Sequence, residues 1–137
     1  MAISAQEAVK SAGSGTTVIG WKLDREQRVE LLQQFPPRFK NVVADHVTLR
    51  PRASANAPLP GEQHGEIIGR VSDGKGVEAM VVQIDGTSDR PGGGTYHITW
   101  SLADGRRAKE SNDVLATQAW EPYDLPMPVK LDPARFR

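Results

Sequence analysis

The sequence predicts an α+β domain. Three observations indicate it: apolar, β-branched runs alternate with helical stretches, the order is β-α-β, hairpin, β-α-β, and 137 residues are enough for one domain with its own core. The content of 38% hydrophobic and 25% charged residues is ordinary for a globular protein. We expect residues 1–15 to be a flexible N-terminus, where a short helix over 5–12 and a frayed end are alternatives. Residues 16–137 should form a single domain.

β-Branched and apolar residues predict the first strand, over residues 16–24. Asp24, at its end, suits the N-cap of a helix over residues 25–35, because its carboxylate can accept hydrogen bonds from free backbone N–H groups. Two consecutive prolines then end this helix. Residues 41–52 predict the next strand, so the first third of the chain is expected to be a β-α-β unit.

Glycine, proline and asparagine mark the loops of the remaining chain, beginning with a loop over residues 53–66. An Asp-Gly-Lys-Gly turn then predicts a hairpin. The further predicted elements are, in order, the two hairpin strands over 66–73 and 77–85, a glycine-rich loop over 86–95, a strand over 96–102, a helix over 106–120, and an extended segment with one short strand over 121–136.

Composition and charge exclude several classes of function. Seventeen basic and 17 acidic residues give a net charge of zero, so the whole molecule has no field that would hold a nucleic-acid duplex. The absence of cysteine excludes disulfides, thiolate zinc sites and a cysteine nucleophile. The first residues do not resemble a signal peptide, and no apolar run is long enough to span a membrane. We therefore expect a cytoplasmic protein without membrane contact.

The motif "HVTL" at residues 46–49 is followed by "HITW" at residues 97–100 in a chain with three histidines. Seven threonines in 137 residues give each histidine about a 5% chance of a threonine two places on, so two such pairs are about a one-in-a-hundred event. Alternate residues of a strand share a face. Each motif is therefore expected to project its histidine and threonine together and to bury its two apolar residues.

Two imidazoles and two hydroxyls on neighbouring strands suit phosphoryl chemistry without a metal. A neutral imidazole can take a proton from a nucleophile, and a protonated one can give a proton to the leaving oxygen. The hydroxyls can donate to the non-bridging phosphate oxygens. We therefore predict His46, Thr48, His97 and Thr99 as catalytic residues. We expect no cofactor and no bound metal, since His-x-Thr is not a usual ligand spacing.

The paired motif resembles the His-x-Thr-x signature of the two-histidine (2H) phosphoesterase superfamily. The stretch "HITWSLADGRRAKESN" is similar to the end of the cyclic phosphodiesterase domain of plant- and fungal-type tRNA ligases, and the resemblance spans about residues 17–129. It implies a compact bilobal fold, in which two antiparallel β-sheets form a central cleft with flanking helices. It also implies hydrolysis of 2′,3′-cyclic phosphates to a monoester. Besides the four catalytic residues, it extends to Lys109 and Asn112.

The resemblance further implies that His97 is the base, that His46 is the acid and that O3′ leaves, giving a 2′-phosphate. The chemistry of the residues alone leaves these roles open. The motifs are closer together than in many relatives (97 − 46 = 51 residues), and the loop over 86–95 replaces a helix. The expected substrates are RNA ends or nucleoside 2′,3′-cyclic phosphates, and the protein is expected to be a monomer.

Arg50, Ser101 and Lys109 are predicted to contact the substrate. Arg50 continues the face of the first motif, although a strand end in solvent explains it equally well. Ser101 continues the face of the second motif, and Lys109 is expected near the start of a helix, where backbone N–H groups favour anions. Tyr96 and Trp100 are expected in the core, on the face opposite to the catalytic residues.

Other interpretations stay open. Within the superfamily, 2′-5′ RNA ligation and cleavage of ADP-ribose cyclic phosphate use the same motifs. Outside enzymes, a domain that binds RNA ends or a protein partner could keep the motifs for packing. Four basic residues lie near the second motif in the sequence: Arg90, Arg106, Arg107 and Lys109. They form either a basic mouth of the pocket or a dispersed solvated surface. His64 is expected in a surface loop.

Overall fold

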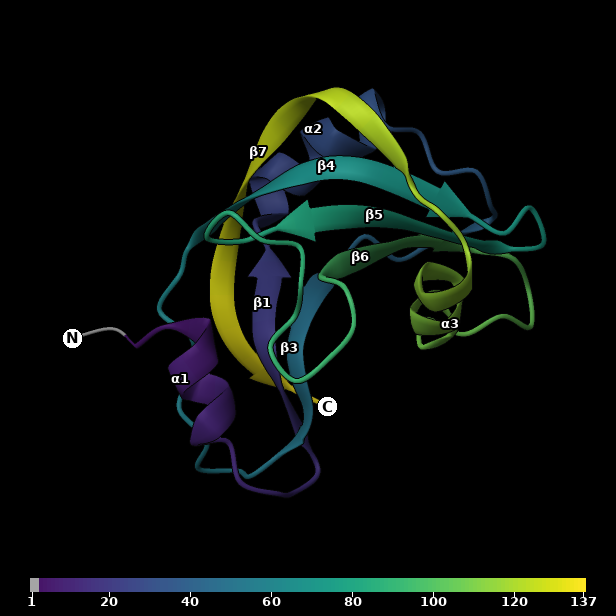
Figure 1. Ribbon diagram of the computed structural model, residues 1–137. Helices are drawn as coiled ribbons and strands as arrows, with labels where there is room; N and C mark the ends of the chain where they lie inside the picture. The colour runs from purple at the N-terminus through teal and green to yellow at the C-terminus, as the bar shows by residue number, and fades with distance from the viewer. Residues whose placement is uncertain (1–2) are drawn as a thin grey trace.

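The computed structural model describes residues 3–137 (Figure 1). Its helices are α1 (Ala5–Lys10), α2 (Arg25–Gln34) and α3 (Glu110–Thr117). Its strands are β1 (Thr17–Leu23), β2 (Asn41–Val42), β3 (His46–Ala53), β4 (His64–Ser72), β5 (Val77–Gln83), β6 (His97–Leu102) and β7 (Glu121–Phe136). A mixed domain with an antiparallel sheet and few helices agrees with the predicted α+β class.

The described strands form a seven-stranded sheet in the order β2-β6-β5-β4-β7-β1-β3. The long β7 arches over the molecule and pairs with β4 through its first part and with β1 through its last part (Figure 1). The expectation of one short strand over residues 121–136 was wrong. The four prolines of this segment argue against a strand, but pairing with two neighbours overrides that local signal.

A bend in the chain at Ala44 brings the two histidine motifs together. β2 pairs with β6, and the chain continues along it, with Val43 N–H donating to Trp100 O and Ala44 N–H to Thr99 O, both at 2.9 Å. Ala44 then adopts a positive φ of 41°, and the chain leaves β6 to form β3. The single strand predicted over residues 41–52 is thus two strands. The first motif begins two residues after the contact with Thr99.

Strand β3 pairs with β1, which has a glycine opposite Thr48. A Cβ atom on Gly20 would collide with the backbone carbonyl of Val47. Glycine is therefore required for β1 to approach the first motif this closely.

The described part of the N-terminal segment packs on the domain instead of standing apart from it. Ser4 caps α1 by accepting a hydrogen bond from Glu7 N–H, and Ala5 N–H donates to Glu62 Oε2 at 3.0 Å. Ala8 and Ala12 are fully buried. The small residues of this segment, without a hydrophobic run, gave no indication of this packing. In the structure, its buried alanines belong to the same core cluster as the strands.

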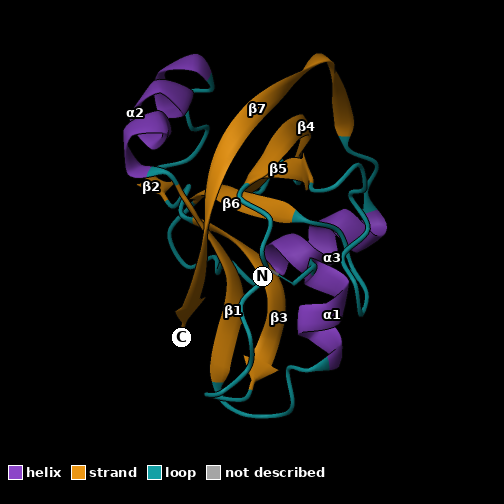
Figure 2. Ribbon diagram, turned by 90° about the vertical axis from the view of Figure 1, so that its left-hand side faces the viewer, coloured by secondary structure: helices purple, strands orange, loops and turns teal. Residues whose placement is uncertain are grey.

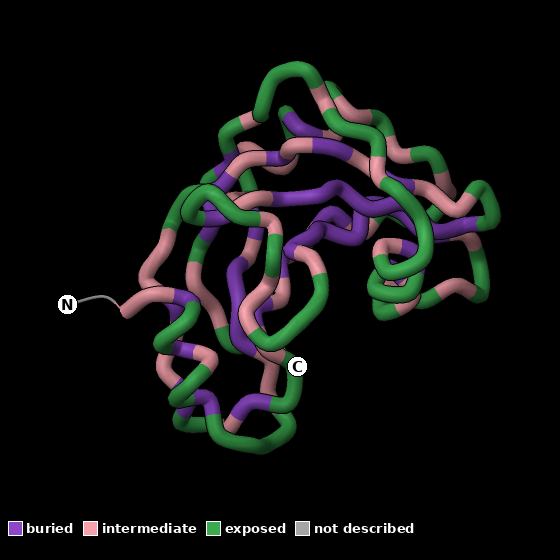
Figure 3. Tube along the Cα trace, viewed as in Figure 1, coloured by how far each residue is buried: buried purple, intermediate pink, exposed green. Residues whose placement is uncertain are grey.

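Apolar side chains of both motifs face the core, as predicted. Val47 and Leu49 of β3 are buried, and so are Ile98 and Trp100 of β6. Strand β6 is buried along its whole length, whereas the loops around the sheet are largely exposed (Figure 3). Tyr96, just before β6, is also buried. The core expectation for Tyr96 and Trp100 is thus confirmed, and the polar residues between them are left to face the other side of each strand.

The helices flank the strands, with α2 on the opposite side from α1 and α3 (Figure 2). Asp24 caps α2 as predicted and accepts from Gln27 N–H at 3.0 Å. Helix α3 is shorter than the predicted helix because residues 103–109 form turns before it. Within residues 3–137, no helix is both long and apolar enough to cross a membrane.

Candidate active site

Both histidine motifs line one pocket of about 220 Å³ between β3, β6 and the start of α3. All four predicted catalytic side chains contribute to its wall, from strands that are far apart in the sheet order. The wall is completed by residues of strands β1 and β3, of the glycine-rich loop, and of α3 with the turn before it: Val18, Pro51, Arg90, Ala108, Lys109 and Asn112.

His97 is only 8% exposed, and its imidazole is held by the backbone. Nδ1 lies 2.8 Å from the carbonyl oxygen of Thr95. Because a carbonyl can only accept, Nδ1 carries the proton, and Nε2 bears the lone pair when the ring is neutral. Burial lowers the pKa of His97, and the positive charges of Arg90 and His46 lower it further, against the opposing effect of the Thr95 carbonyl. This environment favours a neutral imidazole.

His46 has a different environment, with a carboxylate beside it. Its Nδ1 lies 3.0 Å from Asp45 Oδ2, and the two form an ion pair when the imidazole is protonated. Partial burial works to raise the pKa of Asp45, but hydrogen bonds from Lys22 and His46, and their charges, outweigh it and lower this pKa to about 2. Asp45 is therefore ionised at neutral pH. It accepts from Nδ1, which leaves Nε2 of His46 for a ligand.

Two further contacts fix Asp45 and His46. Arg25 Nη1 lies 3.1 Å from Asp45 Oδ1 and holds the second oxygen of the carboxylate. The ring of Phe136, near the end of β7, packs against the His46 ring with centroids 4.6 Å apart. An anchored carboxylate on one edge and an aromatic ring on one face restrict the orientation of the imidazole.

The two threonine hydroxyls differ in their partners. Thr99 Oγ1 donates to the carbonyl of Ala108 at 3.2 Å and shares a 2.9 Å hydrogen bond with the buried hydroxyl of Ser111. Within residues 3–137, the hydroxyl of Thr48 makes no hydrogen bond to another residue. Thr48 can therefore donate to a ligand directly, whereas Thr99 is tied to the start of α3.

Arg90 forms part of the pocket wall from the glycine-rich loop. Its Nε donates to Gly93 O at 2.9 Å, and its Nη2 donates to Asn112 Oδ1 of α3 at 3.3 Å. A Cβ on Gly94 would lie 2.7 Å from Arg90 Nη2, and Gly94 has a φ of +90°. Glycine is therefore needed there for the guanidinium to fold back on its own loop. The loop thus presents one positive charge to the pocket.

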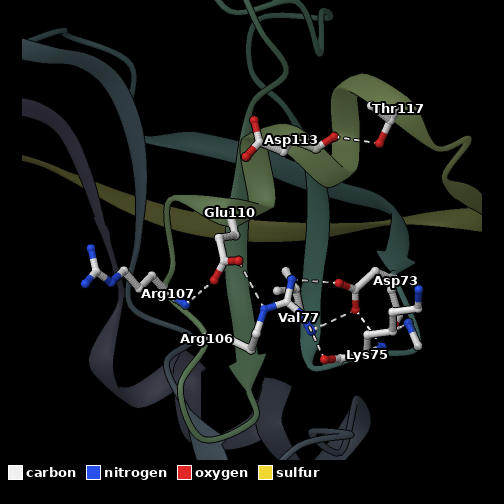
Figure 4. Close-up of polar contacts among 10 residues, drawn as sticks. Asp73, Lys75, Val77, Arg106, Arg107, Glu110, Asp113 and Thr117 are labelled. Atoms are coloured by element: carbon white, nitrogen blue, oxygen red, sulfur yellow. Dashed lines mark hydrogen bonds and ion pairs between the residues drawn. The ribbon is translucent and has the colours of Figure 1, made fainter.

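Lys109 lies at the N-cap of α3 and lines the pocket, as expected for a substrate contact. Arg106 does not line this pocket. Its guanidinium donates to Asp73 Oδ2 at 2.9 Å and to Glu110 Oε1 at 3.1 Å, which ties the β4–β5 turn to the start of α3 (Figure 4). The side chain of Arg107 extends away from this cluster (Figure 4). Of the four basic residues near the second motif, only Arg90 and Lys109 form the basic mouth.

Ser101 was predicted to contact the substrate, but the structure does not place it in the pocket. Its fully buried hydroxyl donates to Glu78 Oε1 at 2.7 Å and accepts from Phe39 N–H at 3.1 Å. The segment at residues 38–39 covers this end of β6, so the pocket ends at Thr99. Burial raises the pKa of Glu78, and the Ser101 hydroxyl stabilises its charged form.

Arg50 lies near the pocket but lines a neighbouring one instead, together with Arg52. His64 is exposed at the start of β4 and is outside the pocket. Among the described residues, no three histidine or carboxylate side chains gather as a metal-ligand cluster.

The sequence did not assign three features in and around the pocket. Asp45 precedes the first motif, and strand alternation would place it on the opposite face from His46; the bend at Ala44 brings it to the imidazole. Ser111 lies between the two residues that the resemblance extended to, and no sequence signal distinguished it. Arg90 was recognised as one of several basic residues, but its position depends on the folded loop.

Comparisons of the chain with protein-family models, with curated proteins and with solved structures each found no significant match. A function is therefore inferred from the geometry of the pocket and from the motifs.

Proposed function

We propose that the protein is a metal-independent 2′,3′-cyclic phosphodiesterase that acts on RNA ends or nucleoside 2′,3′-cyclic phosphates. One observation carries the proposal: both imidazoles line one pocket, and each Nδ1 is occupied by a fixed acceptor. Both Nε2 atoms are thereby left for a ligand, as paired acid–base catalysis requires. The resemblance of the motifs to those of 2H phosphoesterases supports the same conclusion.

The contrasting environments of the imidazoles support the division of roles. His97, whose burial favours the neutral ring, takes a proton from water through Nε2. The water oxygen bonds to phosphorus, the bond from phosphorus to O3′ breaks, and protonated His46, which forms an ion pair with Asp45, gives its proton to O3′. The product is a 2′-phosphate with a free 3′-hydroxyl. Proton exchange with solvent then restores both rings.

Four groups hold the phosphate in this proposal. Thr48 donates a hydrogen bond to one non-bridging oxygen of the phosphate. Thr99 gives up its long hydrogen bond to the Ala108 carbonyl and donates to the second non-bridging oxygen. Arg90 and Lys109 add positive charge on the side of the loop and of α3. These donors stabilise the charge that grows on the phosphate oxygens in the transition state.

We further propose that β4, β5 and β6 form one lobe and β1 and β3 the other lobe of a bilobal 2H fold. The long β7 pairs with both groups of strands, and the pocket lies where β3 meets β6. We expect such an enzyme to act as a monomer in the cytoplasm.

Purified protein should be assayed on oligonucleotides with a cyclic-phosphate end and on 2′,3′-cyclic mononucleotides, with a metal chelator present. We expect turnover that the chelator does not change. Absence of turnover, or turnover that requires added metal, would contradict the proposal. Chromatography against 2′- and 3′-phosphate standards tests the direction of cleavage, and a 3′-phosphate product would reverse the leaving group and the histidine roles.

The other 2H activities need their own substrates. Cleavage of ADP-ribose cyclic phosphate and 2′-5′ joining of RNA ends should be tested in parallel under the same conditions. Faster turnover of either would keep the catalytic residues and replace the proposed substrate.

A further inference from the structure

A second pocket, of about 440 Å³, adjoins the one that holds the histidines. Its wall is formed by residues 14–15 before β1, by the end of β3, and by the start of the glycine-rich loop at residues 90–93. The two pockets share Pro51 and Arg90, so they lie next to each other along the side of that loop. One ligand can therefore extend through both.

Three arginines line this second pocket: Arg50, Arg52 and Arg90. Within residues 3–137, none of the three forms an ion pair with a carboxylate, in contrast to Arg25 and Arg106. Among the residues that the structure describes, no acidic side chain lines this pocket. An uncompensated group of guanidinium ions in a concave surface is a strong site for phosphate, because each can donate two parallel hydrogen bonds to it.

The guanidinium of Arg50 also has few hydrogen-bond acceptors in the described part of the protein. Its Nε is buried and has no hydrogen-bond acceptor, and its Nη2 makes only a 3.4 Å contact to Gly13 O. The protein therefore satisfies little of the hydrogen-bonding capacity of the Arg50 guanidinium. Arg52 is exposed at a positive φ of 58°, where the backbone turns its side chain out of the strand alternation.

We propose that this second pocket binds the phosphodiester on the 5′ side of the terminal nucleotide, so that the substrate is an RNA 3′ end and not a free nucleotide. The inference rests on the proposed function, because it places the cyclic phosphate in the histidine pocket. An RNA chain carries its next phosphate one nucleotide away, and Arg90 lies between the two sites. A nucleoside 2′,3′-cyclic phosphate has no second phosphate and leaves the arginines without a ligand.

The test compares three substrates on the wild-type protein. These are uridine 2′,3′-cyclic phosphate, the dinucleotide UpU with a 2′,3′-cyclic phosphate end, and the same dinucleotide with an uncharged methylphosphonate linkage. We expect kcat/KM for the charged dinucleotide to exceed that for the mononucleotide by at least about tenfold, and the uncharged linkage to lose most of this advantage. The advantage should also decrease as salt is added, because salt screens phosphate contacts.

Variants then assign the effect to the pocket. In Arg50→Met, which keeps the apolar stem, the ratio of dinucleotide to mononucleotide kcat/KM should fall toward one. Arg107→Met is the matched control, since it removes the same charge outside both pockets, and it should keep the wild-type ratio. Melting temperatures show whether each variant is folded. If Arg50→Met does not fold, the comparison of the two dinucleotides on wild-type protein still decides.

The possible failures are distinguishable. Equal kcat/KM values for the mononucleotide and both dinucleotides would overturn the second-pocket inference and leave the proposed function intact. An advantage that the uncharged linkage retains would also overturn it, because the advantage would come from the base or sugar. Absence of turnover on all three substrates would overturn the proposed function and this inference with it.

Discussion

Replacing Asp45 by asparagine tests whether the carboxylate beside His46 is fixed and charged as the structure has it. The amide side chain would keep the shape and an acceptor oxygen but would remove the negative charge that Lys22, Arg25 and His46 share. We expect a loss of stability at neutral pH that disappears when the carboxyl of the wild-type protein is protonated.

The pKa of Asp45 gives the size of the stability effect. A fall from 3.8 to about 2 corresponds to about 2.5 kcal/mol at neutral pH. The side chain is 31% exposed, and solvent screening reduces this to about 1 kcal/mol. For a domain of 137 residues, this lowers the melting temperature by about 3–4 °C.

The sign of the pH dependence follows from the lowered pKa. The charged carboxylate stabilises the folded state above about pH 4, and this contribution is lost as the pH falls through about 2. The wild-type protein and Asp45→Asn should therefore differ in urea or thermal unfolding at pH 7 and converge near pH 2. Asp104→Asn is the control, because that exposed ion pair with Lys40 should contribute almost nothing. A difference independent of pH would refute the reasoning.

The same reasoning gives further predictions. The pH profile of kcat/KM should be bell-shaped, and its rising limb should follow the loss of the proton from His97. Because burial lowers the pKa of His97, this limb should lie below the ordinary histidine value. A rising limb above pH 7 would contradict the assignment of His97 as base. Ser101→Ala should lower the melting temperature by about 3–10 °C, because Glu78 loses a buried hydrogen bond. The same variant should change kcat/KM less than threefold. A large loss of activity in a stable variant would return Ser101 to the substrate site.

The sequence predicted well those features that depend on local pattern. Asp24 at the helix start, the turn between β4 and β5, and the apolar faces of both motifs follow from capping, turn chemistry and strand alternation. That His46 and His97 line one pocket was expected from the duplicated motif, and the structure has this arrangement.

The features that depend on tertiary structure could not be predicted in this way. Ser101 has the same alternation as Thr99, and only the segment covering that end of β6 distinguishes them. The role of Asp45 depends on the positive φ of Ala44, which no residue pattern indicated. The length of β7 depends on pairing with strands distant in sequence, which outweighs its prolines.

The central claim is that His46 and His97 act as paired acid and base. It is tested most directly by His46→Asn and His97→Asn, in which the amide can keep each Nδ1 hydrogen bond while Nε2 is lost. His64→Asn, at the exposed third histidine, is the control. We expect each pocket variant to melt within a few degrees of wild type and to lose about 10²- to 10⁴-fold in kcat/KM on a cyclic-phosphate substrate. The double variant should be little worse, because the two residues act as a unit, and His64→Asn should retain full activity. Variants that keep kcat/KM within tenfold of wild type, or lose activity only in proportion to lost folded protein, would contradict the claim.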